Sequence, residues 1–199
     1  MPIEQLRALH ISDDTGMGTA IVLAGGAGTR LGRPKAAAAL AGRPLVEHVI
    51  AAARDGGLEP IVVAKADTVL PPLDCRIVIE PAAPRHPLCG IIAGLEAIED
   101  HGAVVCATDM PFVTGALLRW LADLDEPFAV IAEQPLPARY GRAIVPALRD
   151  ALAKDESLRG LARRLATRQL EIGELVAFGD PRRMLANINT AAELAAADG

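Results

Sequence analysis

Short runs of consecutive apolar and β-branched residues recur along the first two thirds of the chain. They occupy residues 19–24, 60–64, 75–80, 103–107 and 128–132. Runs in which apolar residues do not alternate with polar ones are typical of strands buried on both faces. The pattern therefore predicts five short, buried strands.

The segments between these strands space their apolar residues three or four positions apart, which is the period of an amphipathic helix. Thr114 precedes one such segment as a predicted N-cap. Strands alternating with helices predict an α/β fold in three layers, with a mostly parallel sheet and helices on both faces. Such a sheet binds its ligand at the carboxyl ends of its strands. The apolar positions that mark the helices are Leu45, Val49 and Ala53; Ile91, Leu95 and Ile98; and Leu117, Leu118 and Leu121.

The alternation stops after residue 132. A Pro-rich stretch at 134–140 is followed by helical segments at 147–153 and 157–166, which we interpret as an elaboration on the substrate side. Thr190 and Glu193 have the spacing of a capping box, which predicts a final short helix. We interpret residues 1–18 as a loose N-terminal extension and residues 19–199 as a single domain, and an alternative start at Met17 stays open.

Composition narrows the class of protein. The 199 residues are 51% hydrophobic and 23% charged, which suits one globular domain with its own core. The formal net charge of -5 argues against a broad basic surface for nucleic acid. No apolar run approaches the roughly 20 residues of a membrane span, and the N-terminus lacks the pattern of a secretory signal. The three cysteines have neither disulfide nor metal-ligand spacing, which fits a reducing cytoplasm. Taken together, these features predict a cytoplasmic protein that binds neither nucleic acid nor a membrane.

A glycine-rich loop follows the first predicted strand. Glycines let backbone N–H groups approach phosphate oxygens, and Arg30 and Lys35 can neutralise the charge of a phosphate. A plain turn between a strand and a helix would need neither cation. The loop matches neither the dinucleotide-binding fingerprint nor the P-loop, yet it suits a polyphosphate. It reads Leu23-Ala24-Gly25-Gly26-Ala27-Gly28-Thr29-Arg30-Leu31-Gly32-Arg33-Pro34-Lys35.

A carboxylate stands directly after the strand predicted at 103–107. Asp109 would lie at the carboxyl end of that strand, facing the glycine loop. Mg²⁺ is usually held through one or two carboxylates together with substrate phosphates, so Asp109 is a candidate metal ligand. Taken alone, an Asp shortly before Pro111 is better explained as a turn former.

The loop pattern L-A-G-G-x-G-x-R-x-G-x-x-K, continued by A-G-R-P-L-V-E-H-V at 41–49, resembles the opening of nucleotidyltransferases of the sugar-nucleotide and molybdenum-cofactor type. Three further segments resemble molybdenum cofactor guanylyltransferases in particular. They are 87–91, similar to G-P-L-A-G-I; 134–140, similar to Q-P-L-x-x-x-Y; and 187–194, similar to N-[IV]-N-T-P-E-[DE]-L. The resemblance covers about residues 19–195 and implies a Rossmann-like nucleotidyltransferase fold whose glycine loop wraps the triphosphate of an NTP.

The family resemblance implies a reaction and its residues. GMP would pass from GTP to the terminal phosphate of molybdenum cofactor, releasing pyrophosphate and forming molybdopterin guanine dinucleotide. Mg²⁺ would be the metal, with Asp109 as its ligand, and cofactor-biosynthesis proteins or molybdoenzyme chaperones are possible partners. The expected catalytic residues are Arg30, Lys35 and Asp109. Matching positions assign nucleotide binding to Leu23, Ala24, Gly25, Gly26, Gly28, Arg30, Lys35 and Asp109, and acceptor binding to Arg139, Tyr140, Arg142, Asn187 and Asn189.

This chain departs from the family pattern near the nucleoside. Guanylyltransferases of this kind typically carry an Asn after the second strand and an Asp after the third. At these places this chain reads Ala64-Lys65-Ala66-Asp67 and Glu80-Pro81, so Glu80 or Asp67 would have to substitute. His86 replaces a usual Gly. A molybdopterin cytidylyltransferase using CTP, a sugar-phosphate nucleotidyltransferase and a non-catalytic cofactor-binding homologue therefore remain alternatives.

Other conspicuous residues have simpler explanations. We expect His48 to lie on a helix and Trp120 to pack in one. The arginines at 159, 163 and 164 have helical spacing and are expected to form a solvated face.

Overall fold

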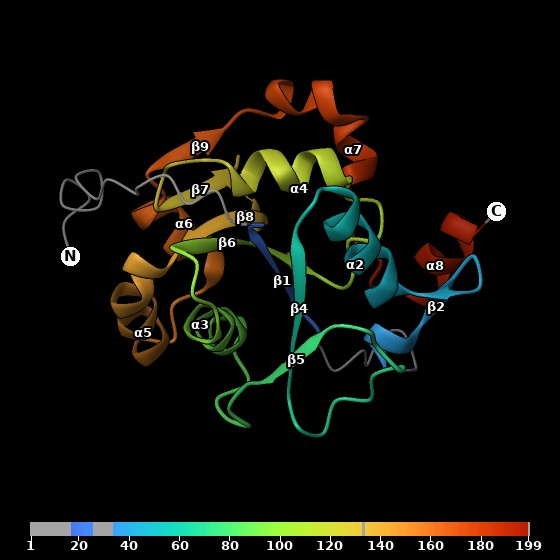
Figure 1. The fold of residues 1–199 in the computed structure, drawn as a ribbon, viewed down its shortest axis with the longest axis horizontal. Coiled ribbons are helices and arrows are strands. Elements are labelled where there is room, and N and C mark those ends of the chain that lie inside the picture. Colours follow the sequence, from blue (N-terminus) through green and yellow to red (C-terminus); the bar gives the residue numbers. More distant parts are fainter. Residues whose placement is uncertain (1–16, 26–33, 133, 199) are drawn as a thin grey trace.

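A seven-stranded sheet in the order β5-β4-β1-β6-β8-β7-β9 runs through the molecule (Figure 1). The computed structural model describes residues 17–25, 34–132 and 134–198. One half of the sheet is parallel, because β1 pairs in parallel with both β4 and β6 and β4 pairs in parallel with β5. These strands are β1 (Thr19–Leu23), β4 (Glu59–Ala64), β5 (Arg76–Ile79) and β6 (Gly102–Ala107).

The other half of the sheet contains a strand that the sequence pattern did not predict. The Pro-rich stretch forms β8 (Gln134–Gly141), which lies antiparallel between β6 and β7 (Phe128–Ile131). Prolines are disfavoured inside a sheet because they lack an N–H donor. Here a register shift between Val130 and Ile131 accompanies the pairing with the Pro-rich end of β8. Strand β9 (Arg168–Leu170) then adds to β7 in parallel at the edge.

Helices cover both faces of the sheet, as predicted. α2 (Leu45–Asp55) and α4 (Gly115–Ala122) bury their apolar sides with the Val22 and Val104 face of the sheet. α3 (Pro87–Ala97), α5 (Val145–Ala153) and α6 (Leu158–Leu165) pack with Ile21 and Val105 on the other face. The three-layer α/β architecture is therefore confirmed.

Short elements complete the described fold. Three of them are 3-10 helices, namely η2 (Lys35–Ala37), η3 (Arg142–Ile144) and η4 (Ile172–Phe178). A separate two-stranded ribbon pairs β2 (Ala39–Leu40) with β3 (Arg43–Pro44). The last helices are α7 (Pro181–Met184) and α8 (Ala191–Asp198), and α8 lies beside β2 (Figure 1).

The predicted strands agree with the observed ones to within about one residue at each end, but one prediction about burial was wrong. β5 was expected to be buried, yet Ile77 is 44% exposed and Ile79 is 58% exposed. Among the described strands, β5 is the last on its side of the sheet and pairs with β4 alone. An apolar run by itself does not distinguish an edge strand from a central one.

Local predictions about helix caps and packing are confirmed. The Thr114 hydroxyl accepts a hydrogen bond from Leu117 N at 3.3 Å and caps α4. Trp120 packs against Phe178, with ring centroids 5.0 Å apart. His48 lies on α2, with Nε2 3.0 Å from the Leu40 carbonyl oxygen. Among the described residues, no helix is long and apolar enough to cross a membrane.

Candidate active site

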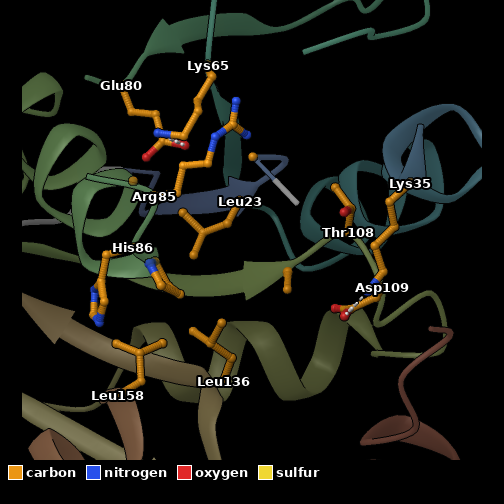
Figure 2. Close-up of a pocket in the computed structure, with 14 residues that line it drawn as sticks. Leu23, Lys35, Lys65, Glu80, Arg85, His86, Thr108, Asp109, Leu136 and Leu158 are labelled. Carbon is orange, nitrogen blue, oxygen red and sulfur yellow. Dashed lines mark hydrogen bonds and ion pairs between the residues drawn. The ribbon is translucent and has the colours of Figure 1, made fainter. Parts of the chain in front are cut away.

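A cavity of about 370 Å³ opens at the carboxyl ends of β1, β4 and β6. Figure 2 shows two groups of charged side chains in it: Glu80 with Lys65 on one side, and Lys35 with Asp109 on the other. The position agrees with the rule that open α/β sheets bind ligands beyond the carboxyl ends of their strands. The lining residues are Leu23, Gly25, Lys35, Lys65, Glu80, Arg85, His86, Pro87, Gly90, Ala107, Thr108, Asp109, Leu136 and Leu158.

Three residues from distant parts of the chain meet at one end of this cavity. The Lys35 ammonium donates to Asp109 Oδ2 at 2.6 Å and to Asn189 Oδ1 at 2.7 Å. The side chains of Lys35 and Asp109 are only 15% and 17% exposed, so solvent screens their interaction less than it would a surface pair. The structure thus joins the end of the glycine loop, the segment after β6 and the C-terminal motif in a single charged cluster.

The capping box of α8 fixes the position of Asn189. The Glu193 carboxylate accepts hydrogen bonds from Asn189 N at 2.7 Å and Thr190 N at 2.9 Å, while the Thr190 hydroxyl accepts from Glu193 N at 3.2 Å. The bond from the Asn189 backbone is the main reason that the pKa of Glu193 is lowered. Ile188 N also donates to the Asp109 carbonyl oxygen at 2.8 Å, which ties the segment before α8 to the cluster. The predicted cap is confirmed, and one of its hydrogen bonds comes from the backbone of Asn189, whose side chain accepts from Lys35.

Asp109 Oδ1, the second carboxylate oxygen, is buried and has no hydrogen-bond partner among the residues that the structure describes. A buried carboxylate oxygen without a partner is costly, because it has lost its water and gained nothing in exchange. A hard cation such as Mg²⁺ prefers oxygen ligands and takes one or two carboxylates together with substrate phosphates. Oδ1 therefore fits a metal-binding role, while Oδ2 is engaged by Lys35.

A second charged pair lines the opposite side of the cavity. Lys65 and Glu80 are 5% and 7% exposed, and Lys65 Nζ lies 3.6 Å from Glu80 Oε1. Lys65 Nζ also donates to the Pro81 carbonyl oxygen at 2.7 Å. Burial raises the pKa of Glu80, and the Lys65 charge opposes that rise. Sequence reasoning overlooked Lys65, although a lysine directly after a buried strand is an informative signal.

Arg85 and His86 also line the cavity (Figure 2). The Arg85 guanidinium donates to Asp67 Oδ2 at 3.2 Å, and both side chains are exposed. His86 Nδ1 accepts a hydrogen bond from Leu88 N at 3.1 Å and so caps α3. His86 therefore has a structural role at a helix terminus and also faces the cavity.

Two residues expected on the acceptor side do not lie in this cavity. Tyr140 is fully buried, stacks on Phe128 with ring centroids 4.6 Å apart and donates its hydroxyl hydrogen to the Pro135 carbonyl oxygen at 3.0 Å. Burial also raises its pKa. Arg139 is 7% exposed and pairs with Val104 in the sheet. Since β8 runs antiparallel to β6, these residues lie toward the amino-terminal end of β6, and the earlier residue Leu136 is the one that reaches the cavity.

The remaining predicted site residues divide into three groups. Leu23 and Gly25 line the cavity, and Ala24 is buried next to them. Arg142 lies in η3 with its guanidinium on the Glu99 carbonyl oxygen, and Asn187 is exposed beyond α7. Gly26, Gly28 and Arg30 lie outside the described residues.

Comparisons with known proteins identify the family of this chain. Residues 20–170 match the family model described as "MobA-like NTP transferase domain". A molybdenum cofactor guanylyltransferase from Xanthomonas euvesicatoria is 30% identical over 180 residues, which cover 86% of this chain and 89% of that protein. A probable molybdenum cofactor guanylyltransferase from Chloroflexus aggregans is 32% identical, covering 89% and 92% of the two chains.

Solved structures share the architecture. The molybdopterin-guanine dinucleotide biosynthesis protein A of Archaeoglobus fulgidus superposes with a TM-score of 0.75 at 25% identity, covering 90% of this chain and 96% of that one. A 2-C-methyl-D-erythritol 4-phosphate cytidylyltransferase from Thermus thermophilus has the same fold, with a TM-score of 0.65 at 19% identity and coverage of 92% and 98%. On the family match and the extent of the alignments, the chain belongs to the MobA-like NTP transferase family.

Proposed function

We propose that the protein transfers GMP from GTP to the terminal phosphate of molybdenum cofactor, forming molybdopterin guanine dinucleotide and pyrophosphate. Membership of the MobA-like family and the names of its relatives support this reaction. The observation that carries the proposal is the contact of Lys35 with Asp109 and Asn189, because it combines a cation and a carboxylate in a cavity that Gly25 also lines.

The reaction needs little covalent help from the protein. An oxygen of the acceptor's terminal phosphate attacks the α-phosphorus of GTP, a new P–O bond forms, and the bond to the β-phosphate oxygen breaks so that pyrophosphate leaves. The phosphate nucleophile is already ionised near neutral pH and needs no general base. Catalysis then consists of bringing two polyanions together in line and of offsetting their charge.

Lys35 would make the main described contribution to that charge balance. Its ammonium is held by two acceptors, so it points at one place instead of sampling many rotamers. An ammonium fixed in advance stabilises developing negative charge without having to reorganise during the reaction. Asn189 and Oδ2 of Asp109 orient Lys35, and Arg30, Gly26 and Gly28 would complete the phosphate site.

Asp109 Oδ1 would hold Mg²⁺ together with phosphate oxygens of the nucleotide. When bound there, Mg²⁺ supplies positive charge that offsets the charge on the transferred phosphoryl group and on the leaving pyrophosphate. The two oxygens of Asp109 thus have separate tasks, one toward the metal and one toward Lys35.

We further propose that residues 19–199 act as one domain in the cytoplasm, with residues 1–18 as an extension. Cofactor-biosynthesis proteins or molybdoenzyme chaperones would supply the acceptor or receive the product, since molybdenum cofactor is unstable when free. Nothing in the proposed reaction requires nucleic acid or a membrane.

The decisive experiment is a product assay with purified protein, molybdenum cofactor, Mg²⁺ and each of GTP, CTP, ATP and UTP. We expect a dinucleotide and pyrophosphate with GTP. Product from CTP alone would assign the protein as a cytidylyltransferase. Nucleotide binding without any product would favour a non-catalytic cofactor-binding role.

A further inference from the structure

A second cavity, of about 210 Å³, adjoins the main one. The two cavities share Gly25, Lys35 and Arg85 as lining residues, so these residues stand where one cavity meets the other. The rest of the described lining of the second cavity comes from residues 34–36 and from residues 67–69, which follow β4. The second cavity therefore opens directly beside Lys35, the cation of the proposed phosphate site.

Arg85 is the less restrained of the two cations that line both cavities. Among the described residues, its guanidinium has one hydrogen-bond partner, Asp67 Oδ2 at 3.2 Å. A guanidinium carries five N–H donors, so this single contact leaves most of them available. The side chains of Arg85 and Asp67 are 64% and 70% exposed, and an exposed ion pair is held weakly because water screens it. Arg85 can therefore exchange Asp67 for an anion that binds it better.

The turn after β4 places Asp67 and a hydroxyl group beside the second cavity. Thr68 N donates to the Lys65 carbonyl oxygen at 3.0 Å, and Lys65 N donates to the Thr68 hydroxyl at 3.1 Å. These two bonds close the turn that carries Asp67. The hydrogen of the Thr68 hydroxyl has no acceptor among the described residues, so it can be donated to a ligand.

The main cavity is apolar at the end away from Arg85. In Figure 2, Leu136 and Leu158 lie below Leu23, whereas Arg85 lies above it. An in-line displacement places the attacking and the leaving oxygen on opposite sides of the phosphorus. Leucine side chains offer a leaving polyphosphate no hydrogen bonds, so that end suits the acceptor. A leaving group that departs in the opposite direction from the acceptor moves toward Arg85 and the second cavity.

We propose that the second cavity receives the leaving pyrophosphate, and that Arg85 exchanges its contact with Asp67 for pyrophosphate oxygens. The inference rests on the proposed function, because pyrophosphate is the product of that reaction. When the bond from the α-phosphorus to the bridging oxygen breaks, the oxygen keeps the electron pair and pyrophosphate carries the charge away. A guanidinium can bind two phosphate oxygens at once, which makes pyrophosphate a better partner for Arg85 than its single contact with Asp67.

Asp67 would then favour release of the product. While pyrophosphate is bound, the Asp67 carboxylate lies close to a polyanion and competes with it for Arg85. This competition keeps pyrophosphate from binding as tightly as it would to an unpaired guanidinium. Release of a product is a common limit on turnover, so a binding site that also contains a competitor suits a leaving group.

The test compares the binding of pyrophosphate and GMP, since GMP lacks the two phosphates that leave. Dissociation constants are measured by calorimetry with Mg²⁺ on the full chain. Arg85→Met should raise the dissociation constant of pyrophosphate about tenfold, the effect of losing hydrogen bonds from a charged group, and should change that of GMP less than about twofold. An equal loss for GMP would place Arg85 on the nucleotide and overturn the inference. Absence of pyrophosphate binding to the unaltered protein would also overturn it.

Further variants separate a specific contact from a general effect of charge. Arg85→Lys keeps the charge without the planar guanidinium and should retain part of the affinity. Asp67→Asn removes the competitor and should tighten pyrophosphate binding by up to about fivefold, whereas weaker binding would contradict the exchange. The exposed pair of Arg54 and Asp74 supplies the matched controls, Arg54→Met and Asp74→Asn. If Arg54→Met weakens pyrophosphate binding as much as Arg85→Met does, the inference is wrong.

Inhibition by added pyrophosphate provides a readout during turnover. In the product assay, the inhibition constant of pyrophosphate should rise with Arg85→Met by the same factor as the dissociation constant. An unchanged inhibition constant would show that Arg85 binds pyrophosphate outside the reaction, which overturns its role toward the leaving group. Failure of the unaltered protein to form a dinucleotide from any of the four nucleotides would instead overturn the proposed function, and the binding comparison would still decide whether Arg85 holds pyrophosphate.

Discussion

Lys35 and Asp109 are 74 residues apart in the chain, and their side chains meet at 2.6 Å. Lys35 opens the short helix after the glycine loop, and Asp109 follows the central strand β6. The contact exists only because β1 and β6 are parallel neighbours, which brings the segments after both strands to the same edge of the sheet. This arrangement makes each partner testable separately.

Asp109→Asn should abolish most turnover while preserving the shape of the side chain. It removes the charge from Oδ1, which has no partner among the described residues, and weakens the hold on Lys35. We expect kcat to fall roughly 10²- to 10³-fold, the scale for losing one preorganised electrostatic group. Asp150→Asn, in the exposed pair with Lys154, is the charge-matched control. Unchanged turnover in Asp109→Asn would rule out its proposed metal role.

Lys35→Met should weaken nucleotide binding more than it weakens folding. The methionine keeps the length of the side chain, but the triphosphate loses a fixed cation. We expect the dissociation constant for GTP to rise about tenfold or more, as for a lost charged hydrogen bond. Calorimetry with Mg²⁺ measures this, and Lys154→Met on the exposed Asp150 pair is the control. Equal GTP affinity in both variants would contradict the assignment.

Gly25→Ala should disturb the site through Glu80. The new methyl group would overlap Glu80 Oε1, so the carboxylate must leave its position. We expect a loss of about 1–3 kcal/mol of unfolding free energy, the usual cost of overpacking. Denaturant titration measures it. Gly173→Ala is the matched control, because a Cβ there meets nothing within 4 Å. A cost in Gly173→Ala as large as that in Gly25→Ala would show that the loss does not come from Glu80.

The C-terminal cap should respond to acid. Because hydrogen bonds from the Asn189 and Thr190 backbones lower the pKa of Glu193 in the folded state, the stabilisation is complete above the ordinary value of 4.5. It is lost as the pH falls through the lowered pKa. The amide NMR signals of both donor residues, followed from pH 7 down to about 3, should move together at a midpoint below 4.5. Glu193→Ala should abolish that transition and weaken the placement of Asn189 beside Lys35.

Cysteine reactivity reports on the core independently of function. Cys106 is fully buried in β6, and burial raises its pKa to about 12, so almost no thiolate exists near neutral pH. Cys75 is partly exposed, whereas Cys89 is buried at the start of α3. Alkylation of native protein at pH 8 followed by mass spectrometry should modify Cys75 first. Early labelling of Cys106 would show that β6 opens more readily than its burial implies.

The sequence by itself determined those features that depend on neighbouring residues. Strand and helix periods located the elements of the parallel half of the sheet, because burial on one or both faces leaves a local apolar pattern. The Thr114 cap and the Thr190 and Glu193 capping box were also predictable, since their hydrogen bonds span only three residues. Motif resemblance pointed to Lys35 and Asp109 as candidate site residues before any geometry was known.

Only the tertiary structure decided which distant residues meet. Asn189 lies 154 residues from Lys35, and no local period connects them. The Pro-rich segment became β8 because two neighbouring strands pair with it, and its antiparallel direction carried Arg139 and Tyr140 away from the cavity. Lys65 and Glu80 become a buried pair because β4 and β5 are adjacent and end together. Such contacts depend on strand order and direction, which a single sequence does not encode in any short stretch of residues.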